Sequence, residues 1–272
     1  MENGGGEAIY LFCFARSIPD QVMAGADGID HHPLFLHRFA DIAAILSKVP
    51  LEDFCGPEAS ARMQDLNWIG PRVCRHEKAV EQAMRYSPVL PARFGTLFSS
   101  LDSLEKLAET HHQTISRFLD QVADKEEWAI KGLLDRDKAK EKFISLSLSG
   151  KSGHLDSLPP GMRYLQQQRI RAGVEKELNS WVKKICEGVE NGLSNYASEV
   201  CKRKVFNLEA AGGAKDMILN WAFLVPRKAR EDFSARIDRE NADRLDCGLA
   251  FELSGPWPPY SFAPSLELGP GT

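Results

Sequence analysis

The sequence predicts an α+β protein of two domains, followed by a tail rich in proline and aromatic residues. Apolar runs of strand length alternate with stretches in which apolar residues recur every three or four positions. The second half follows the order β-α-β-β-α-β, the split βαβ pattern of a ferredoxin-like fold. We therefore expect an N-terminal mixed α/β sheet domain at 1–124, a ferredoxin-like domain at 125–254 and the tail at 255–272.

Length and composition are those of a folded chain. With 272 residues, of which 43% are hydrophobic and 26% charged, it can bury a core without disulfide or metal support. No window approaches the roughly 18 consecutive apolar residues of a membrane span, and Glu2 stands where a signal peptide needs positive charge. The net charge of -4 gives no overall attraction to nucleic acid. We expect a cytoplasmic protein with no membrane and no nucleic-acid partner.

The first half begins with strands. Residues 8–15 (AIYLFCFA) are apolar throughout, which is typical of a strand buried on both faces. Residues 34–39 and 42–49 form two short strands that we expect to pair as a hairpin. The pattern over 60–86 then predicts either one helix or a turn followed by a helix that begins at Pro71.

Proline and capping signals shape the rest of the first half. Residues 87–98 (SPVLPARFGTLF) contain two prolines and a glycine, which predicts an irregular or edge strand. Asp102 and Glu105 have the spacing of a capping box, so we expect them to begin a second helix. The apolar stripe of that helix runs from Leu104 to Val122.

The second half alternates strands and helices. A strand at 127–134 precedes a charged and then Ser/Gly-rich stretch at 135–160, which predicts a long loop with a short helical turn inside it. Apolar residues then recur with a nearly unbroken helical period over 162–203, which predicts one long amphipathic helix. In the tail, the density of prolines excludes regular structure, and we expect its aromatic residues to pin it to the body. The remaining predicted elements are strands at 205–210, 217–225 and 247–253 and a helix at 230–245.

Motifs for catalysis or cofactor binding fail on their spacing. The six cysteines include no C-x-x-C pair and are expected to be reduced. His76-Glu77 begins an H-E-x-x-H zinc motif, but the fifth position is Val80. Cys74 and His76, two positions apart on a helix, point away from one another, which disfavours a Cys-His nucleophile pair. We therefore expect no metal, no cofactor and no catalytic group.

Three arginines allow two interpretations. Arg72 and Arg75 lie on the predicted helix near Glu77, and Arg93 lies in the segment Pro-Ala-Arg-Phe-Gly. In the structural interpretation, they form an ion-pair and hydrogen-bond network that ties the helix to the irregular strand. In the functional interpretation, the same network frames a partner-binding surface. The local sequence leaves both open.

Several unusual segments, taken together, resemble the F/L family of gas vesicle accessory proteins. They occur in the family's order from about residue 8 to 262, so the resemblance covers nearly the whole chain. The longest are Pro88-Val89-Leu90-Pro91 with Arg93-Phe94-Gly95-Thr96 and Phe98, and Gly255-Pro256-Trp257-Pro258-Pro259-Tyr260-Ser261-Phe262. The shorter ones are Asp65 to Trp68, Pro71-Arg72, Arg75 to Glu77, Glu127-Trp128 with Lys131, Tyr164-Leu165 with Arg169, and Leu224 to Pro226 with Phe233.

The resemblance implies a non-enzymatic protein that is needed to build gas vesicles, the hollow protein-walled flotation organelles of bacteria and archaea. Its implied partners are the hydrophobic gas vesicle shell protein and other gas vesicle accessory proteins. It would keep the shell protein from aggregating or nucleate the shell, and it could remain as a minor vesicle component. A wall-forming subunit exposes apolar surface before assembly, which a binder can cover. We place the shell contact on the N-terminal domain, near Arg72, Arg75, Arg93 and Phe94.

Two rival classes of function stay open. A self-associating structural scaffold of the vesicle would pair through sheet edges or through the long helix, and light scattering of the isolated protein would detect it. A small-molecule enzyme of ferredoxin-like fold would need a deep cleft with converging titratable groups. A strongly shifted pKa of His76 in such a cleft would favour the enzyme.

Overall fold

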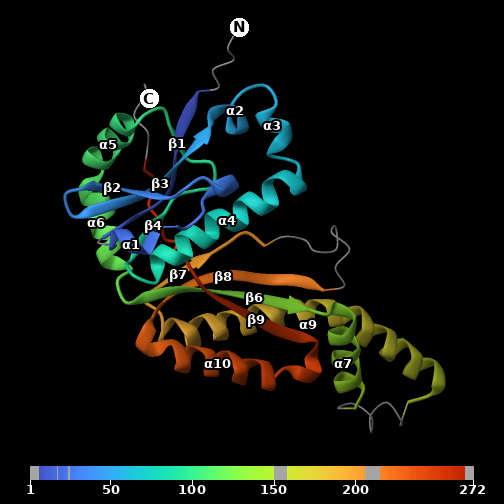
Figure 1. The fold of residues 1–272 in the computed structure, drawn as a ribbon. Helices are drawn as coiled ribbons and strands as arrows, with labels where there is room; N and C mark the ends of the chain where they lie inside the picture. The colour runs from blue at the N-terminus through green and yellow to red at the C-terminus, as the bar shows by residue number, and fades with distance from the viewer. Residues whose placement is uncertain (1–5, 17, 24, 150–157, 206–214, 267–272) are drawn as a thin grey trace. The chain divides into compact units, whose positions relative to one another are not determined.

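The computed structural model describes residues 6–16, 18–23, 25–149, 158–205 and 215–266 (Figure 1). The chain divides into two compact units, Met1–Glu126 together with Trp257–Thr272, and Glu127–Pro256. We call them the N-terminal unit and the C-terminal unit. Each contains one β-sheet and its own apolar core, so the chain is a mixed α+β protein.

A five-stranded sheet forms the centre of the N-terminal unit. The strand order is β2-β3-β1-β4, with β5 also paired to β1, and all of these pairs are antiparallel. Phe39 pairs with Ile42, so β2 and β3 form the predicted hairpin. The strands are β1 (Glu7–Ala15), β2 (Phe35–Phe39), β3 (Ile42–Pro50), β4 (Val89–Pro91) and β5 (Leu97–Phe98).

Helices cover both faces of this sheet. In Figure 1, α4 lies on one face, and α5 and α6 lie on the other. β1 is buried along its length after Glu7, which confirms the predicted strand with two buried faces. The helices of this unit are α1 (Asp20–Met23), the 3-10 helix η1 (Ile29–His31), α2 (Leu51–Phe54), α3 (Ala59–Arg62), α4 (Leu66–Met84), α5 (Leu101–Thr110) and α6 (His112–Gln121).

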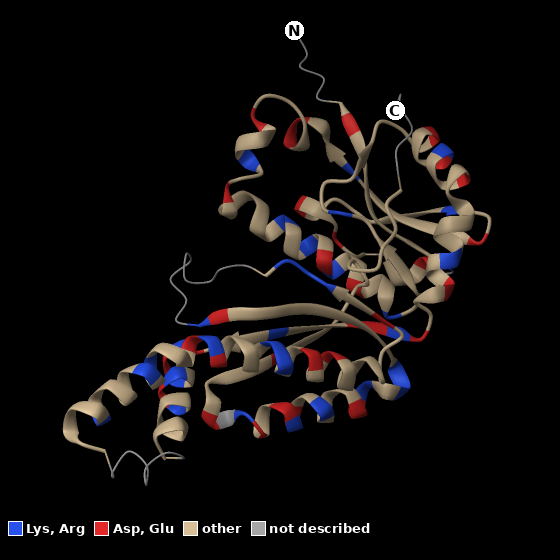
Figure 2. Cartoon of the chain, turned by 180° about the vertical axis from the view of Figure 1, so that it is seen from behind, with Lys and Arg blue, Asp and Glu red and all other residues tan. Residues whose placement is uncertain are grey.

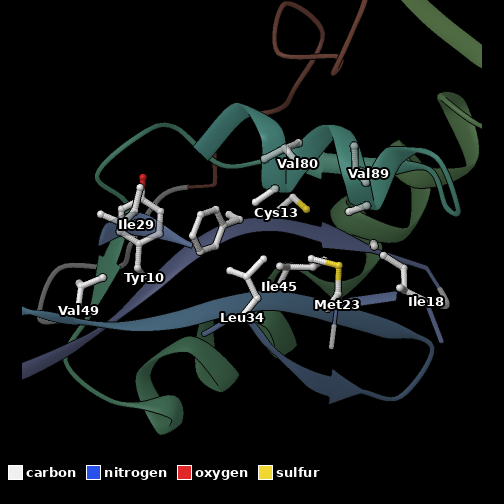
Figure 3. Packing of buried hydrophobic residues seen from close by; sticks show 14 of the residues in the cluster. Tyr10, Cys13, Ile18, Met23, Ile29, Leu34, Ile45, Val49, Val80 and Val89 are labelled. Carbon is white, nitrogen blue, oxygen red and sulfur yellow. The ribbon is translucent and has the colours of Figure 1, made fainter. Parts of the chain in front are cut away.

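The core beneath α4 is built from side chains that are distant in sequence. Figure 3 shows Tyr10 and Cys13 of β1 with Ile45 of β3, Val80 of α4 and Val89 of β4 in one cluster. Burying an apolar side chain of this size contributes about 1.5–3 kcal/mol, so the cluster fixes α4 on the sheet. It thereby also fixes the polar residues that α4 carries.

The helix predicted over 60–86 is divided into α3 and α4. α4 begins at Leu66 because Asp65 caps it, its carboxylate accepting the backbone N–H of Asn67 at 2.9 Å. Pro71 consequently lies inside α4 and removes one helix hydrogen bond. The alternative in which the helix begins at Pro71 was wrong.

The predicted capping box of Asp102 and Glu105 was also wrong. Ser100 caps α5, since its hydroxyl accepts from the Ser103 N–H and the Ser103 hydroxyl accepts from the Ser100 N–H. Serine is as good a cap as aspartate, and Ser100 lies next to the last residues of β5. The single stripe predicted from Leu104 to Val122 belongs to two helices, which meet at His111.

The C-terminal unit contains a four-stranded sheet with the order β7-β8-β6-β9. Trp128, Leu178, Phe223 and Phe233 are among the buried side chains between this sheet and its helices. The elements are β6 (Lys125–Leu134), α7 (Arg136–Ser149), α9 (Pro160–Ser194), β7 (Glu199–Lys202), β8 (Asp216–Pro226), the 3-10 helix η3 (Arg227–Ala229), α10 (Arg230–Ala242), the 3-10 helix η4 (Leu245–Cys247) and β9 (Leu249–Trp257).

The loop predicted at 135–160 contains a helix, α7. Asp135 accepts the N–H of Lys138 at 3.0 Å, an N-terminal cap that the charged composition concealed. Buried Ala139 and the edge contact of Phe143 with Trp181 then hold α7 against α9. The prediction of a long loop was therefore wrong for Arg136–Ser149, and residues 150–157 lie outside the described part.

The helix predicted over 162–203 ends early. α9 stops at Ser194, and Glu199–Lys202 forms β7, which pairs antiparallel with β8. Half-buried Tyr196 and Val200 continued the apolar spacing beyond the helix and so misplaced its end. The strand predicted at 205–210 falls almost wholly outside the described residues.

The tail begins as a strand. β9 continues through Gly255-Pro256 to Trp257, so the prediction that this segment lacks regular structure was wrong for its first residues. β9 is the last strand of its sheet, and an edge strand tolerates proline. Among the described helices, no stretch is long and apolar enough to cross a membrane.

Candidate functional site

Segments from opposite ends of the sequence meet at one buried histidine in the N-terminal unit. His76 of α4 is 1% exposed. Its Nε2 lies 3.1 Å from the carbonyl oxygen of Ala92 and 3.1 Å from the hydroxyl oxygen of Tyr260. Its Nδ1 lies 2.9 Å from the hydroxyl oxygen of Tyr10 on β1. One ring thus joins α4, the central strand, the turn after β4 and the tail.

The partners of His76 fix its protonation state. A carbonyl oxygen only accepts, so Nε2 carries the proton and donates to Ala92 and Tyr260. Nδ1 then accepts from the Tyr10 hydroxyl, whose oxygen accepts the Gly95 N–H at 3.1 Å. Burial lowers the pKa of His76 to about 4, so the ring is neutral at pH 7.

Burial also raises the pKa of Tyr10 and of Tyr260, so both hydroxyls keep their protons. The Tyr260 hydroxyl donates to the Glu77 carboxylate, whose charge raises the Tyr260 pKa further. A strongly shifted histidine in a cleft is what the enzyme hypothesis required. Both nitrogens of His76, however, are occupied within the fold, and His76 does not line the cavity of this unit.

The segment Pro-Ala-Arg-Phe-Gly-Thr forms a turn in which the side chains of Arg93 and Phe94 point in different directions. The N–H and hydroxyl of Thr96 donate to the carbonyl oxygen of Arg93, at 3.1 and 2.7 Å. Gly95 has a φ of 80°, a left-handed conformation that costs glycine little. Phe94 packs on the side of α4, with its ring centroid 6.1 Å from that of Tyr10, whereas Arg93 lines a cavity.

The cavity has a volume of about 480 Å³ and opens beside β1. Its walls come from β1, β4, β5, α5 and the tail, and Arg93 is the one charged residue among those that line it. Within the described part of the chain, no acidic side chain pairs with the Arg93 guanidinium. Its apolar lining includes Leu11, Phe14, Leu90, Phe98, Leu107 and Leu266.

Arg72 and Arg75 are half-buried against η1 and do not line this cavity. Arg72 donates to Asp30 of η1 at 2.7 and 2.9 Å, and its guanidinium lies 4.0 Å from the ring centroid of Trp68. Arg75 donates to His31 at 2.7 Å. The network of the structural interpretation exists, but it ties α4 to η1, not to the irregular strand.

This network supports an unfavourable backbone. Asp30 and His31 have φ values of 49° and 65°, left-handed conformations that residues other than glycine rarely adopt. Because Nε2 of His31 accepts from Arg75, its Nδ1 carries the proton and donates to Asp27 at 2.8 Å. The two arginines therefore stabilise the backbone of η1. The sequence predicted that they form a network, but not that η1 is its partner.

The sequence-predicted site residues thus divide into three groups. Arg72 and Arg75 meet at η1, Phe94 joins the aromatic cluster around His76, and Arg93 lines the cavity. Tyr10 and Tyr260 were not singled out as site residues. The sequence feature that could have identified them is a tyrosine within an otherwise apolar or proline-rich segment. Such a tyrosine is expected to be buried, and its hydroxyl then needs a hydrogen-bond partner.

Metal binding finds no support in the described ranges, where no three His, Cys, Asp or Glu side chains converge. All six cysteines are free thiols, and Cys13 is buried in the core. The residues that line the cavity offer apolar contact together with one cation, Arg93.

Comparison with known proteins finds relatives that match nearly the whole chain. The chain is 25% identical over 260 residues to gas vesicle protein L of Streptomyces sp. (strain CB03234), covering 95% of this chain and 93% of the relative. It is 25% identical over 264 residues to gas vesicle protein F of Dolichospermum flosaquae, covering 94% and 97%.

Its fold resembles the crystal structure of gas vesicle protein GvpF from Anabaena sp. PCC7120, with a TM-score of 0.69 and 20% identity, covering 96% of this chain and 97% of that one. The model of the family described as gas vesicle synthesis protein GvpL/GvpF matches residues 8–264, which include the turn at Arg93, His76 and Tyr260. On this full-length match, the chain belongs to the GvpL/GvpF family of gas vesicle synthesis proteins.

Proposed function

We propose that this chain assists gas vesicle assembly by binding the shell protein and that it performs no bond chemistry. It would act in the cytoplasm and at the gas vesicle, together with other accessory proteins of the family. In this role it covers apolar surface on shell subunits before they enter the wall, which limits their aggregation. Family membership over residues 8–264 supports the assembly role.

The observation that carries the shell-binding proposal is the cavity beside β1. Apolar walls fit an apolar segment of a wall-forming subunit, and the Arg93 guanidinium fits a carboxylate carried by that segment. An arginine without an acidic partner in the described fold is available for one in a complex. We propose that Arg93 contacts the shell protein directly.

The other predicted site residues would act from beneath this surface. Phe94, in the aromatic cluster with His76, sets the turn that presents Arg93. Arg72 and Arg75 hold α4 to η1 and so keep the cluster in place. We therefore propose that these three are positioning residues and that only Arg93 makes the contact.

The domain organisation belongs to the same proposal. We propose that the two units are the two domains of the chain and that the C-terminal unit is ferredoxin-like. Its strands, in the order β7-β8-β6-β9, are the second, third, first and fourth of that unit. This is the order that two interleaved β-α-β halves produce, which supports the assignment.

One of the sheet edges through which a self-associating scaffold could pair is covered. β9 is an edge strand of the C-terminal sheet, and the Asn241 side chain of α10 pairs with its backbone at Phe251. The amide of Asn241 accepts the N–H of Phe251 at 2.7 Å and donates to its carbonyl oxygen at 2.9 Å. A neighbouring strand would have to displace both bonds, so this edge is protected against pairing with a second copy.

Co-purification of the full chain with tagged shell protein tests the proposal. Arg93→Ala removes the cation, and Ala263→Trp fills the cavity from its tail wall. Arg117→Ala on α6 is a matched control, because it removes an exposed arginine that does not line the cavity. Circular dichroism and a thermal melt of each variant establish that it is folded.

We expect Arg93→Ala and Ala263→Trp to reduce the recovered shell protein several-fold, and Arg117→Ala to recover as much as the wild type. A buried charged contact of this kind changes affinity by about tenfold or more, which co-purification detects. Wild-type recovery by both cavity variants, folded and at equal expression, would contradict the placement of the shell contact.

A further inference from the structure

The long helix α9 changes character on its solvent side. In its first turns, Met162, Tyr164 and Leu165 are 57%, 60% and 59% exposed. Further along the same helix, the large exposed side chains are polar or charged, as at Lys176 and Lys183. This later part of α9 has the polar solvent-exposed face that is usual for a surface helix, so the exposed apolar residues of the first turns are unusual by comparison.

Helical geometry gathers these exposed residues into one surface. At about 100° per residue, Leu165 and Ala172 lie on one line along the helix. From Leu165, Arg169 and Met162 lie about 40–60° to one side, and Arg171 and Tyr164 lie about 100–120° to the other, so the six residues span about half of the helix circumference. We call these six residues the α9 surface, and all of them are exposed. The opposite side of these turns points inward, with Val174 buried.

The charge of the first turns has one sign. Between Pro160 and Val174 the sequence contains Arg163, Arg169 and Arg171 and no acidic residue (Figure 2). The first acid, Glu175, pairs with Arg136 and Lys140. The helix dipole does not explain this pattern, because its positive end favours Asp and Glu in the first turn and its effect has faded before Arg169 and Arg171.

We propose that the α9 surface docks an acidic amphipathic helix of a partner protein. The apolar line would receive the apolar stripe of that helix, and Arg169 and Arg171 would pair with carboxylates on its two flanks. Exposed large apolar residues rimmed by polar ones mark such interaction sites. This contact lies in the C-terminal unit and is independent of the cavity in the N-terminal unit.

Charge decides between this partner and two others. A second copy of the chain would bring arginines against arginines across a two-fold contact, which is unfavourable. An anionic membrane attracts clusters of about four to eight Lys and Arg, whereas the α9 surface contributes only Arg169 and Arg171. An acidic helix matches both the apolar line and the small number of cations.

Fluorescence anisotropy of the full chain with labelled synthetic peptides tests the proposal. The probe is an amphipathic helical peptide with a leucine stripe flanked by glutamates, and its counterpart has lysines in place of the glutamates. The variants are R169E/R171E, which reverses the charge, and M162S/L165S, which removes apolar side chains. K176E/K183E is the matched control, since it makes the same charge change on exposed positions of the same helix.

We expect the acidic peptide to bind, the basic peptide not to bind, and the affinity to fall with added salt. R169E/R171E should weaken binding by about tenfold or more, because two ion pairs are replaced by repulsion. M162S/L165S should weaken it about as much, and K176E/K183E should stay within about twofold of the wild type.

Four results would overturn the proposal. Equal binding of the two peptides, or an equal loss in K176E/K183E, would show that the contact is not specific to this surface. Tighter binding to phosphatidylserine vesicles than to the acidic peptide would assign the surface to lipid. A dimer seen by light scattering and abolished by M162S/L165S would assign it to a second copy.

Discussion

Acidification tests the assignment of His76 as a buried neutral ring. In the folded chain its pKa is lowered to about 4 from an ordinary value of 6.5, chiefly because burial disfavours the charged form. Between these two values the unfolded chain binds a proton that the folded chain does not. Stability contributed by the neutral ring is therefore fully present above pH 6.5 and is lost as the pH falls toward 4.

The size of this loss follows from the two pKa values. A difference from 6.5 to about 4, at about 1.4 kcal/mol per pH unit, corresponds to roughly 3 kcal/mol. By pH 4.5 most of it is lost, roughly 2.5 kcal/mol relative to pH 7.5. Because His76 is 1% exposed, solvent screening leaves this figure largely intact. It is a large part of the roughly 5–15 kcal/mol that stabilises a typical domain.

Urea denaturation of the full chain at pH 7.5 and pH 4.5 measures the effect as a difference between variants. Carboxylates also lose stability on acidification, so the wild type is compared with His76→Gln, which cannot titrate but can still donate to the Ala92 carbonyl. We expect the pH-dependent loss to be about 2.5 kcal/mol smaller in His76→Gln. His32→Gln, which removes a histidine outside this network, is the control variant.

Two outcomes would refute the reasoning. Equal slopes for the wild type and His76→Gln would mean that this ring does not couple folding to pH. A midpoint near pH 6.5 for the His76 ring protons by NMR, in the folded protein, would mean that it is not held neutral by burial.

Three further predictions concern single features of the fold. Asn241→Ala should destabilise the chain by about 1–3 kcal/mol in urea and, by exposing the β9 edge, produce dimers in light scattering. Gly132→Ala should lower the free energy of unfolding by about 1–3 kcal/mol, because a Cβ at this position would lie 2.8 Å from Leu219 Cγ. Gly188→Ala in α9 is its control: a Cβ there would have nothing within 4 Å, so a thermal melt should show no change or a gain of up to about 1 kcal/mol. Ser100→Ala should cost about 1 kcal/mol by removing the α5 cap, and the neighbouring Ser99→Ala, which removes no cap, is its control in the same melt.

Local patterns predicted the strands of the N-terminal unit well. The continuous apolar run of β1 and the spacing of β2 and β3 depend only on neighbouring residues and on burial. Helix ends were harder, because several residues compete for one cap. Ser100 and Asp102 both had the chemistry of a cap, and the position of β5 decided between them. Such a decision depends on tertiary structure, which spacing along the chain does not contain.

In the second half, α7 and β7 were assigned wrongly because each has too few buried residues to give a clear periodic pattern. α7 begins with alternating charges, so its buried side, represented by Ala139 and half-buried Phe143, is short and its helical period weak. β7 has only 4 residues, and over so short a stretch the spacing of apolar residues in a strand cannot be told apart from that in a helix. Its pairing with β8 decides the assignment, and that partner comes later in the chain.

The candidate site could be predicted only as separate motifs. The turn at Arg93 and the tail at Tyr260 were both recognised as unusual, but their joint contact with His76 was not. His76 and Tyr260 are 184 positions apart, so no local pattern connects them. Arg72, Arg75 and Arg93 illustrate the same limit, since three arginines of similar local appearance have two different environments.

Because the tail completes the N-terminal unit, the two units cannot be compared by cutting the chain between them. Tyr260, Ala263 and Leu266 form one wall of the cavity, although they follow the whole C-terminal unit in sequence. A fragment of residues 1–126 would therefore lack that wall and would lose the Tyr260 hydroxyl from Nε2 of His76. If such a fragment failed to bind shell protein, the failure would not exclude the N-terminal unit as the binding site. Substitutions in the full chain separate the two explanations, because they alter the cavity while the tail still completes the unit.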